Sequence, residues 1–272
     1  MPILPSLPPI EHPPLSRPEP RTEFPDGLPL PRRYWAIVTI ALGIIMAVMD
    51  GAIANVALPT IALDLHARPA FSIWIVNGYQ LAITISLLPL ASLGEIVGYR
   101  RVYLGGLVLF TVASLACALS HSLVGLTVAR VIQGFGAAGI MSVNSALVRF
   151  IYPHRILGRG IGINALVVAI SAAAGPSIAA AILAGFTWPY LFAVNLPFGV
   201  AALAIGIRAL PHTPRGKHAF DWPSAVFSAL TFGLGIAAID SVGHGEAPLY
   251  YLSELVVAVL SGFRSEERRV GQ

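Results

Sequence analysis

The chain has 272 residues, of which 56% are hydrophobic and only 11% are charged. A soluble domain of this size normally carries about 25% charged residues, so the composition excludes an ordinary soluble domain. The net charge of +4 could favour nucleic-acid binding, but the basic residues are placed as membrane topology requires.

Residues 1–33 differ in composition from the rest of the chain. Eleven of the 22 prolines fall in the first 31 positions, and the four arginines of residues 1–33 are offset by four acidic residues. Such a segment cannot bury enough apolar surface to form a core, which predicts a disordered tail over residues 1–33. The tail lacks the signal-peptide order of basic start, apolar stretch and small-residue cleavage site.

Beyond the tail, the chain contains eight apolar segments. A helix needs roughly 20 apolar residues to cross a bilayer. Lipid offers no partners for backbone polar groups, so each segment is expected to be an α-helix, and the segments are too long for barrel strands. The sequence therefore predicts an all-α, polytopic transmembrane helical bundle with spans at about 34–57, 71–93, 102–120, 123–148, 159–184, 188–209, 222–241 and 249–263.

Basic residues are distributed unevenly among the segments that connect these spans. Twelve of the seventeen Lys and Arg fall on the same side as the N-terminus, and only Arg68 falls in a connection on the other side. Cytoplasmic connections of membrane proteins carry an excess of basic residues. We therefore predict a cytoplasmic N-terminus and no nucleic-acid partner.

One acid and one arginine lie inside the predicted spans. Asp50 is near the outer end of the first span, where Pro59 is expected to mark the exit, and Arg130 is near the outer end of the fourth. At 1.5 Å per residue, both are roughly 10–13 Å below the outer boundary. A lone charge in lipid costs at least ~2.5–3.5 kcal/mol, so both should face the bundle interior. Two interpretations stay open: a proton- or cation-responsive site, or a static ion pair joining two helices.

The other polar residues within the spans are mostly amides. Interhelical hydrogen bonds explain most such residues, and one or two could contact a substrate; the cavity candidates are Asn77, Gln80, Asn144 and Asn164. The single cysteine, Cys117, is expected to be a buried, inert thiol. The seven histidines are scattered and the sequence has no nucleophile motif, so we expect no metal, no cofactor and no enzymatic activity.

Two motifs in the first spans resemble those of the Major Facilitator Superfamily, specifically its fourteen-helix drug:proton antiporters. MDGAIANVALPTI (49–61) is similar to the first-helix signature, with Ala52 in place of the usual threonine. ASLGEIVGYRR (91–101) resembles the motif of the loop between helices two and three, with Glu95 in place of an aspartate. In that loop, an acid beside a glycine turn and a basic pair can latch neighbouring helix ends.

Two further motifs follow in the same order as in that family. RVIQGFGAA (130–138) resembles the fourth-helix motif, and SAAAGPSIAAAI (171–182) resembles the fifth-helix antiporter motif, although Ser171 stands where a glycine is common. TWPYLFAVNLPFG (187–199) matches a Trp–Phe–Asn–Pro pattern that enters helix six. The resemblance covers roughly residues 34–260. It implies proton coupling by Asp50 and Arg130, and gating or motif roles for Asn55, Pro59, Glu95, Gly98, Arg100, Arg101, Gln133, Gly134, Gly136, Gly175 and Pro176.

The C-terminal end of the chain predicts a truncation. Residues 249–263 give about 22 Å of helix, short of the ~30 Å hydrocarbon core. The following octapeptide, RSEERRVG (264–271), looks like the translation of a sequencing adapter, so we expect residues 264–272 to be an artefact and the true sequence after about residue 263 to be missing. A natural basic terminus is the alternative. Transport in this fold needs two halves, so this chain alone is expected to be inactive.

These observations predict five parts: a cytoplasmic tail (1–33), a six-helix bundle (34–210) that forms the N-terminal half of the fold, a cytoplasmic loop (211–221), one complete and one partial extra helix (222–263) and the artefact tail. The predicted function is that of a secondary transporter in a bacterial inner membrane, which exchanges protons for a small hydrophobic or cationic compound. The alternatives are a carrier of a specific metabolite and a non-transporting membrane scaffold. The expected partners are the lipid bilayer, the transported compound and protons, and the sequence indicates no particular accessory efflux protein.

Overall fold

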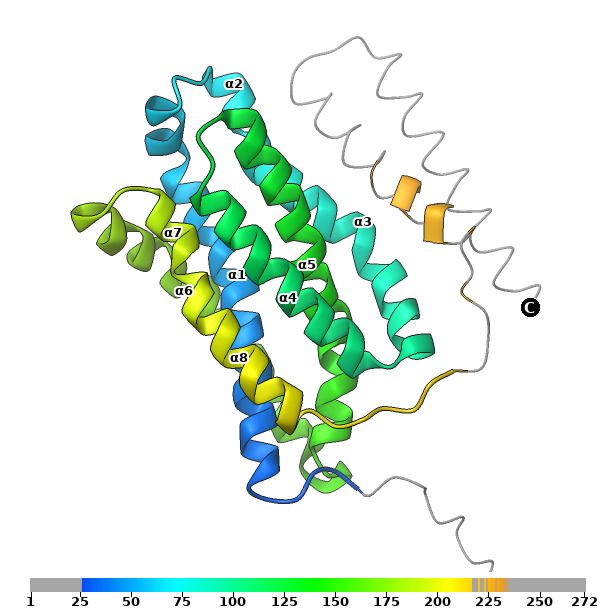
Figure 1. Ribbon diagram of the computed structural model, residues 1–272. Helices are drawn as coiled ribbons and strands as arrows, with labels where there is room; N and C mark the ends of the chain where they lie inside the picture. The colour runs from blue at the N-terminus through cyan, green and yellow to red at the C-terminus, as the bar shows by residue number, and fades with distance from the viewer. Residues whose placement is uncertain are drawn as a thin grey trace, which may run out of the picture.

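The computed structural model describes residues 26–216, together with residues 220, 223, 225–227, 229–231 and 233 (Figure 1). Every regular element among them is helical. In chain order these are α1 (Arg32–Asp64), α2 (Pro69–Ser72), α3 (Trp74–Val97), α4 (Tyr99–Ala118), α5 (Leu123–Ile151), the short 3-10 helix η1 (His154–Ile156), α6 (Leu157–Gly185), α7 (Pro189–Ala193) and α8 (Asn195–Ala209).

The long helices pack as two groups of three that exchange partners. The first group is α1, α3 and α4, and the second is α5, α6 and α8. The first helix of each group packs most extensively against the last two helices of the other group: α5 against α3 and α4, and α1 against α6 and α8. This reciprocal packing is what two inverted three-helix repeats produce. It places α1 and α5 side by side at the centre, where Asp50 and Arg130 lie.

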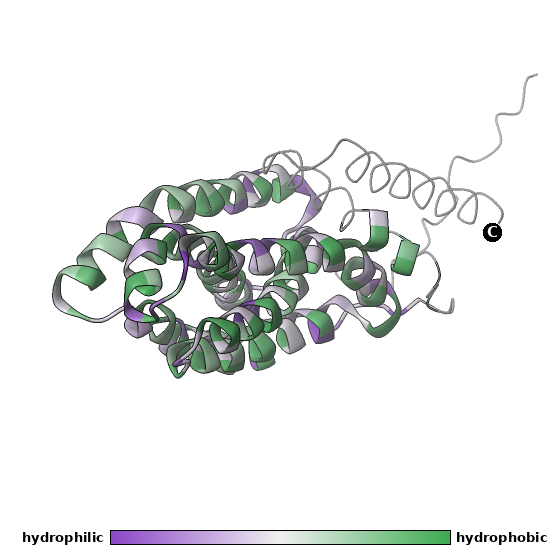
Figure 2. Ribbon diagram, turned by 90° about the horizontal axis from the view of Figure 1, so that it is seen from above, coloured by the Kyte–Doolittle hydropathy of each residue, from purple (hydrophilic) through white to green (hydrophobic). Residues whose placement is uncertain are grey.

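Six stretches of the described chain are long and apolar enough to cross a membrane. Hydrophobic residues predominate along all the helices (Figure 2). Large apolar side chains on the bundle surface, such as Val112, Leu166 and Val200, are more than half exposed. Such a surface suits lipid rather than water. The predicted all-α, multi-pass bundle is therefore confirmed.

The first helix is longer than predicted. It continues through Pro59 to Asp64, so Pro59 does not mark the exit from the first span. A proline removes one helical hydrogen bond, which long membrane helices tolerate, and the end of α1 gains a tertiary contact because Trp188 Nε1 donates to Asp64 Oδ2 at 2.7 Å. Asp50 is therefore about 21 Å from the end of α1, rather than 10–13 Å. It still reaches Arg130, because α1 extends past the start of α5.

The end of the predicted N-terminal tail is folded onto the bundle. Leu28 is buried, its backbone N–H donates to the carbonyl of Ile151 at 3.0 Å, and Arg33 Nε donates to the carbonyl of Leu28 at 2.9 Å. Asp26 accepts hydrogen bonds from the backbone N–H of His154 and lies 2.7 Å from its ring nitrogen Nδ1. Asp26 and Leu28, expected to belong to the tail of residues 1–33, are thus held against the bundle, because Leu28 finds an apolar site. Residues 1–25 lie outside the described residues.

The Asp26–His154 contact is expected to weaken at low pH. Hydrogen bonds from the His154 side chain and backbone hold the pKa of the Asp26 carboxyl below its ordinary value of 3.8. A carboxyl with a lowered folded pKa stabilises the folded state above its ordinary pKa. This contact is therefore present at neutral pH and is lost as the pH falls through the lowered folded pKa.

Glycines allow α4 and α5 to approach closely. A Cβ atom on Gly106 would lie 2.8 Å from the carbonyl oxygen of Gly136 and 2.9 Å from the Cα of Gly139, both backbone atoms that cannot move aside. Small residues at such crossings permit the tight packing on which membrane bundles depend. Gly136, a glycine of the motif on α5, therefore has a packing role as well.

We expect Gly106→Ala to lower the free energy of unfolding by about 1–3 kcal/mol, the usual cost of overpacking. Gly105→Ala is the matched control, because a Cβ at this neighbouring position meets nothing within 4 Å. Denaturant titration of both variants in detergent measures the difference. Equal stability of the two variants would contradict the close α4–α5 contact.

The remaining predicted parts fall mostly outside the described residues. Described positions between 223 and 233 are helical, within the seventh predicted span (222–241). The eighth predicted span (249–263) and the predicted artefact tail (264–272) lie entirely outside the described residues.

Candidate functional site

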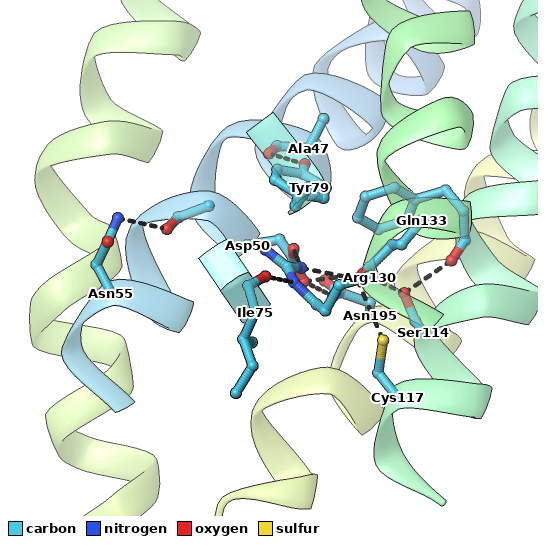
Figure 3. Close-up of polar contacts among 12 residues, drawn as sticks. Ala47, Asp50, Asn55, Ile75, Tyr79, Ser114, Cys117, Arg130, Gln133 and Asn195 are labelled. Carbon is cyan, nitrogen blue, oxygen red and sulfur yellow. Dashed lines mark hydrogen bonds and ion pairs between the residues drawn. The ribbon is translucent and has the colours of Figure 1, made fainter. Parts of the chain in front are cut away.

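Asp50 is the centre of a buried polar cluster (Figure 3). Its side chain is 1% exposed and accepts three hydrogen bonds from three different residues. Arg130 Nη1 donates to Oδ2 and forms an ion pair with the carboxylate. Gln133 Nε2 and Asn195 Nδ2 both donate to Oδ1, at 3.0 Å and 2.8 Å. Donors alone surround the two oxygens, which suits an ionised carboxylate because that form only accepts hydrogen bonds.

Helix α5 supplies two members of the cluster from one face. Arg130 and Gln133 are three residues apart, which places their side chains together on a helix, and Arg130 Nη1 also donates to Gln133 Oε1 at 2.7 Å. Arg130 is completely buried. Its Nε donates to the backbone carbonyl of Ile75 at 3.2 Å, and its guanidinium lies 4.0 Å from the centre of the Tyr79 ring. The arginine therefore ties α5 to both α1 and α3.

Helix α4 completes the cluster around Gln133. Gln133 Nε2 donates to Ser114 Oγ at 2.9 Å, and the Cys117 thiol lies 3.5 Å from Gln133 Oε1. Cys117 is buried, as expected. With Asn195 at the start of α8, the cluster joins α1, α3, α4, α5 and α8. Direct and shared contacts therefore link the Asp50 carboxylate to four other helices.

Two polar atoms in the cluster have no hydrogen-bond partner among the described residues: Arg130 Nη2 and Asn195 Oδ1. Leaving a buried polar atom unpaired costs about 1–3 kcal/mol. The free acceptor Oδ1 of Asn195 lies close to Asp50 and could accept a hydrogen bond from a protonated Asp50 carboxyl.

The glycines of the motifs let the helices around this cluster approach one another closely. A Cβ on Gly134 would lie 2.6 Å from the backbone oxygen of Tyr79, and one on Gly175 would lie 2.5 Å from the Cβ of Ala52. Gly134 thus lets α5 pack closely against α3 beside Arg130. Gly175 lets α6 pack closely against α1 just after Asp50. Gly136 lies against α4 at Phe110, while Pro176 lies inside α6.

The loop between α3 and α4 forms a latch at the end of the bundle where α1 begins, which we call the basal end. Gly98 joins the two helices with a φ of 99°, a conformation that favours glycine. Arg100 donates to the backbone carbonyl of Ile207 and lies 3.2 Å from the His212 ring, so it connects the loop to α8. Gly216 N donates to the backbone carbonyl of Glu95 at 2.7 Å.

The Glu95 carboxylate makes no latch contact among the described residues, so its expected role stays a prediction. The Glu95 side chain is exposed and has no ion pair among them. Arg100 makes the latch instead, because the last carbonyls of α8 lie within its reach and carry partial negative charge. Arg101 is also exposed and lines an apolar groove beside α3.

The candidate cavity residues do not join the Asp50 cluster. Asn144 is buried about 16 Å further along α5 than Gln133, and Asn164 lines a small separate pocket with Tyr152. Asn77 is half-buried and Gln80 is exposed on α3. Among the first-helix motif residues, Asn55 and Pro59 are exposed, and the Asn55 amide bonds only to the carbonyl of Gly51 one turn away (Figure 3).

The site includes residues that the sequence analysis did not assign to it. Asn195 could have been assigned because it belongs to the Trp–Phe–Asn–Pro pattern and is an amide within a span. Ser114 has no such signal: its hydroxyl also donates to the carbonyl of Phe110 one turn back, as serines commonly do in membrane helices. Tyr79, whose hydroxyl donates to the carbonyl of Ala47 at 2.8 Å, also reads from the sequence as an ordinary aromatic core residue.

Comparison with known proteins places this arrangement in a family. Residues 40–263 match the family model described as Major Facilitator Superfamily. The chain belongs to the Major Facilitator Superfamily. The fold, the reciprocal packing of the two helix groups and the positions of the motifs agree with this membership. The family and its relatives point to a transport protein rather than an enzyme.

Several relatives in the superfamily are similar to this chain. The uncharacterized transporter YebQ of Escherichia coli is 60% identical over 87% of this chain and 52% of its own length. The riboflavin transporter RibZ of Clostridioides difficile is 32% identical over 86% of the chain and 51% of its own length. The tetracenomycin C resistance and export protein of Streptomyces glaucescens is 36% identical over 87% and 45%. The chain spans about half the length of the curated relatives it matches.

Proposed function

We propose that the chain supplies the N-terminal half of a secondary transporter that exports small hydrophobic or cationic compounds in exchange for protons. The observation that carries the proposal is the buried Asp50 carboxylate, held by Arg130, Gln133 and Asn195 at the junction of five helices. An ionisable group inside a membrane bundle is costly and marks a functional site by default. The named export function of the Streptomyces relative supports the direction of transport.

The geometry provides a way for one proton to loosen the bundle. A proton on Asp50 removes the charge that holds Arg130 and turns one carboxylate oxygen from an acceptor into a donor. In the structure, Asn195 Nδ2 donates to Asp50 Oδ1. After protonation, rotation of the Asn195 amide would turn its own unpartnered oxygen toward the new hydroxyl of Asp50. The α1–α5 ion pair and the α1–α8 hydrogen bond thus change together, which would loosen α1 from two helices of the second group.

Substrate would bind between this half and a second half, as in other transporters built from repeats. Proton uptake at Asp50 and release of substrate are then linked because both bias the same rocking movement. The polar residues Asn77, Gln80, Asn144 and Asn164 remain proposals for the substrate cavity, and none of them is part of the ion-pair cluster. No cofactor or metal has a part in this mechanism.

The orientation is part of the proposal. Arginines gather at the basal end of the bundle, where α1 begins and α3, α5 and α8 end. The excess of basic residues on this side supports a cytoplasmic basal end in a bacterial inner membrane. The motif latch made by Arg100 would then lie in the cytoplasm.

A second candidate is the transport of a specific metabolite on the same scaffold. One relative of this chain is named as a riboflavin transporter. A full-length protein that carries this half, reconstituted with a pH-sensitive dye inside the vesicles, separates the two. Proton movement on addition of ethidium supports drug exchange, whereas movement with riboflavin and none with ethidium would replace the proposed substrate class. A membrane scaffold would move no protons with either compound.

A further inference from the structure

A groove of about 500 Å³ opens at the basal end between the start of α1 and the end of α8. Its lining includes Arg32 and Trp35 from α1, and Ile205 and Arg208 from α8. In Figure 1 these two helix ends lie next to each other at the bottom of the bundle. The volume is in the range of sites that bind small molecules. The groove is remote from the Asp50 cluster, which is about 22 Å further along α1 from Trp35.

The rim of the groove is positively charged. Arg32 Nε and Nη2 donate to the carbonyls of Ala209 and Leu210, at 3.0 Å and 3.2 Å. These bonds hold the guanidinium in place, and its Nη1 group takes no part in them. Arg208 is exposed in the last turn of α8. Residues 26–216 contain four acidic side chains, and none of them lines the groove.

The walls of the groove are apolar below this charged rim. Ile205 and Ala204 line one side, and Trp35 on the other side is 54% exposed. A partly exposed tryptophan one turn inside a membrane helix is typical of the headgroup level of a bilayer. A groove with a cationic rim at this level and apolar walls beneath fits an amphipathic anion that lies along the bilayer normal.

We propose that this groove binds an anionic phospholipid from the leaflet at the basal end. The phosphate would accept hydrogen bonds from Arg32 and Arg208, since guanidinium groups match phosphate oxygens in charge and geometry. The glycerol region would lie beside Trp35, and an acyl chain would follow the apolar wall of α8. Basic pockets between membrane helices recognise lipid headgroups in this way. A bound lipid would connect the first helix of one group to the last helix of the other.

Native mass spectrometry of the purified full chain tests this proposal with dioleoyl phosphatidylglycerol, dioleoyl phosphatidylcholine and free glycerol phosphate as probes. Phosphatidylglycerol should bind most tightly, and Arg208→Gln should weaken its binding about fivefold, the effect of one charge at a membrane surface. Arg155→Gln is the matched control, because Arg155 is exposed at the same end but lies outside the groove. The affinity of the Arg155→Gln variant for phosphatidylglycerol should stay within about twofold of that of the unaltered chain.

Four results would overturn the proposal. Equal losses in Arg208→Gln and Arg155→Gln would mean that the lipid responds only to overall charge. Equal binding of phosphatidylcholine would remove the role of the anionic headgroup. Displacement of the lipid by glycerol phosphate would assign the groove to a free phosphate compound. Tighter lipid binding after removal of residues 1–25 would show that the N-terminal segment of the chain itself occupies the groove.

Discussion

Asp50→Asn is expected to lower the free energy of unfolding by about 3–5 kcal/mol, the cost of removing one partner from a buried ion pair. Arg130 is fully buried and its main counter-charge is Asp50. A guanidinium cannot give up its proton at accessible pH, so the variant leaves a buried charge that has no means of neutralising itself. Denaturant titration of the chain in detergent, followed by loss of helical signal, measures the effect.

Two further variants separate the ion pair from general effects of the substitution. Asp64→Asn makes the same chemical change on the same helix, at an exposed carboxylate that accepts one hydrogen bond from Trp188. It should cost about 1 kcal/mol or less. The double variant Asp50→Asn with Arg130→Gln should recover part of the lost stability, because the uncompensated charge is gone. An Asp50→Asn variant as stable as Asp64→Asn would mean that Arg130 does not depend on this carboxylate.

Arg130→Lys is expected to lower the free energy of unfolding by about 3 kcal/mol although the charge is kept. The guanidinium donates to Asp50, Gln133 and Ile75 in fixed directions and lies against the Tyr79 ring. A lysine ammonium is a compact, strongly hydrated charge without this planar fork. The loss combines a hydrogen bond of a charged group, about 1.5–3 kcal/mol, with part of a desolvated cation–π contact, about 2 kcal/mol.

The control for this substitution is Arg149→Lys, an exposed arginine near the end of the same helix. It should change the free energy of unfolding by less than about 0.5 kcal/mol, as surface substitutions usually do. The same denaturant titration serves for both variants. If Arg130→Lys is as mild as Arg149→Lys, charge alone explains the role of Arg130, and the contacts with Ile75 and Tyr79 contribute little.

The helical architecture could be predicted from the sequence because apolar runs of membrane length have few structural alternatives. Asp50 and Arg130 could be singled out for the same reason, since a charge within an apolar run is conspicuous. The end of α1 could not be predicted: Pro59 indicates a break, whereas the helix continues to Asp64, whose contact with Trp188 comes from a distant part of the chain.

The uncharged residues of the site were harder to predict than its two charged residues. In a helix that is apolar on all sides, hydrophobic periodicity does not indicate which face turns toward the neighbours. Hydrophobic periodicity alone therefore does not separate Asn195 from Asn164, yet Asn195 contacts Asp50 and Asn164 lies in a separate pocket. The partners of Arg100 could not be predicted either, because Ile207 on α8 and His212 just after it follow Arg100 by more than 100 residues.

The most direct test of the proposed role of Asp50 is proton-driven transport by a full-length protein that carries this half. In vesicles with an imposed pH gradient, the unaltered protein should accumulate substrate against its concentration gradient. Asp50→Asn should still exchange substrate down a concentration gradient, but the pH gradient should no longer drive accumulation. If the Asp50→Asn protein accumulates substrate in response to the pH gradient as the unaltered protein does, Asp50 is not the proton-binding group and its pair with Arg130 is purely structural.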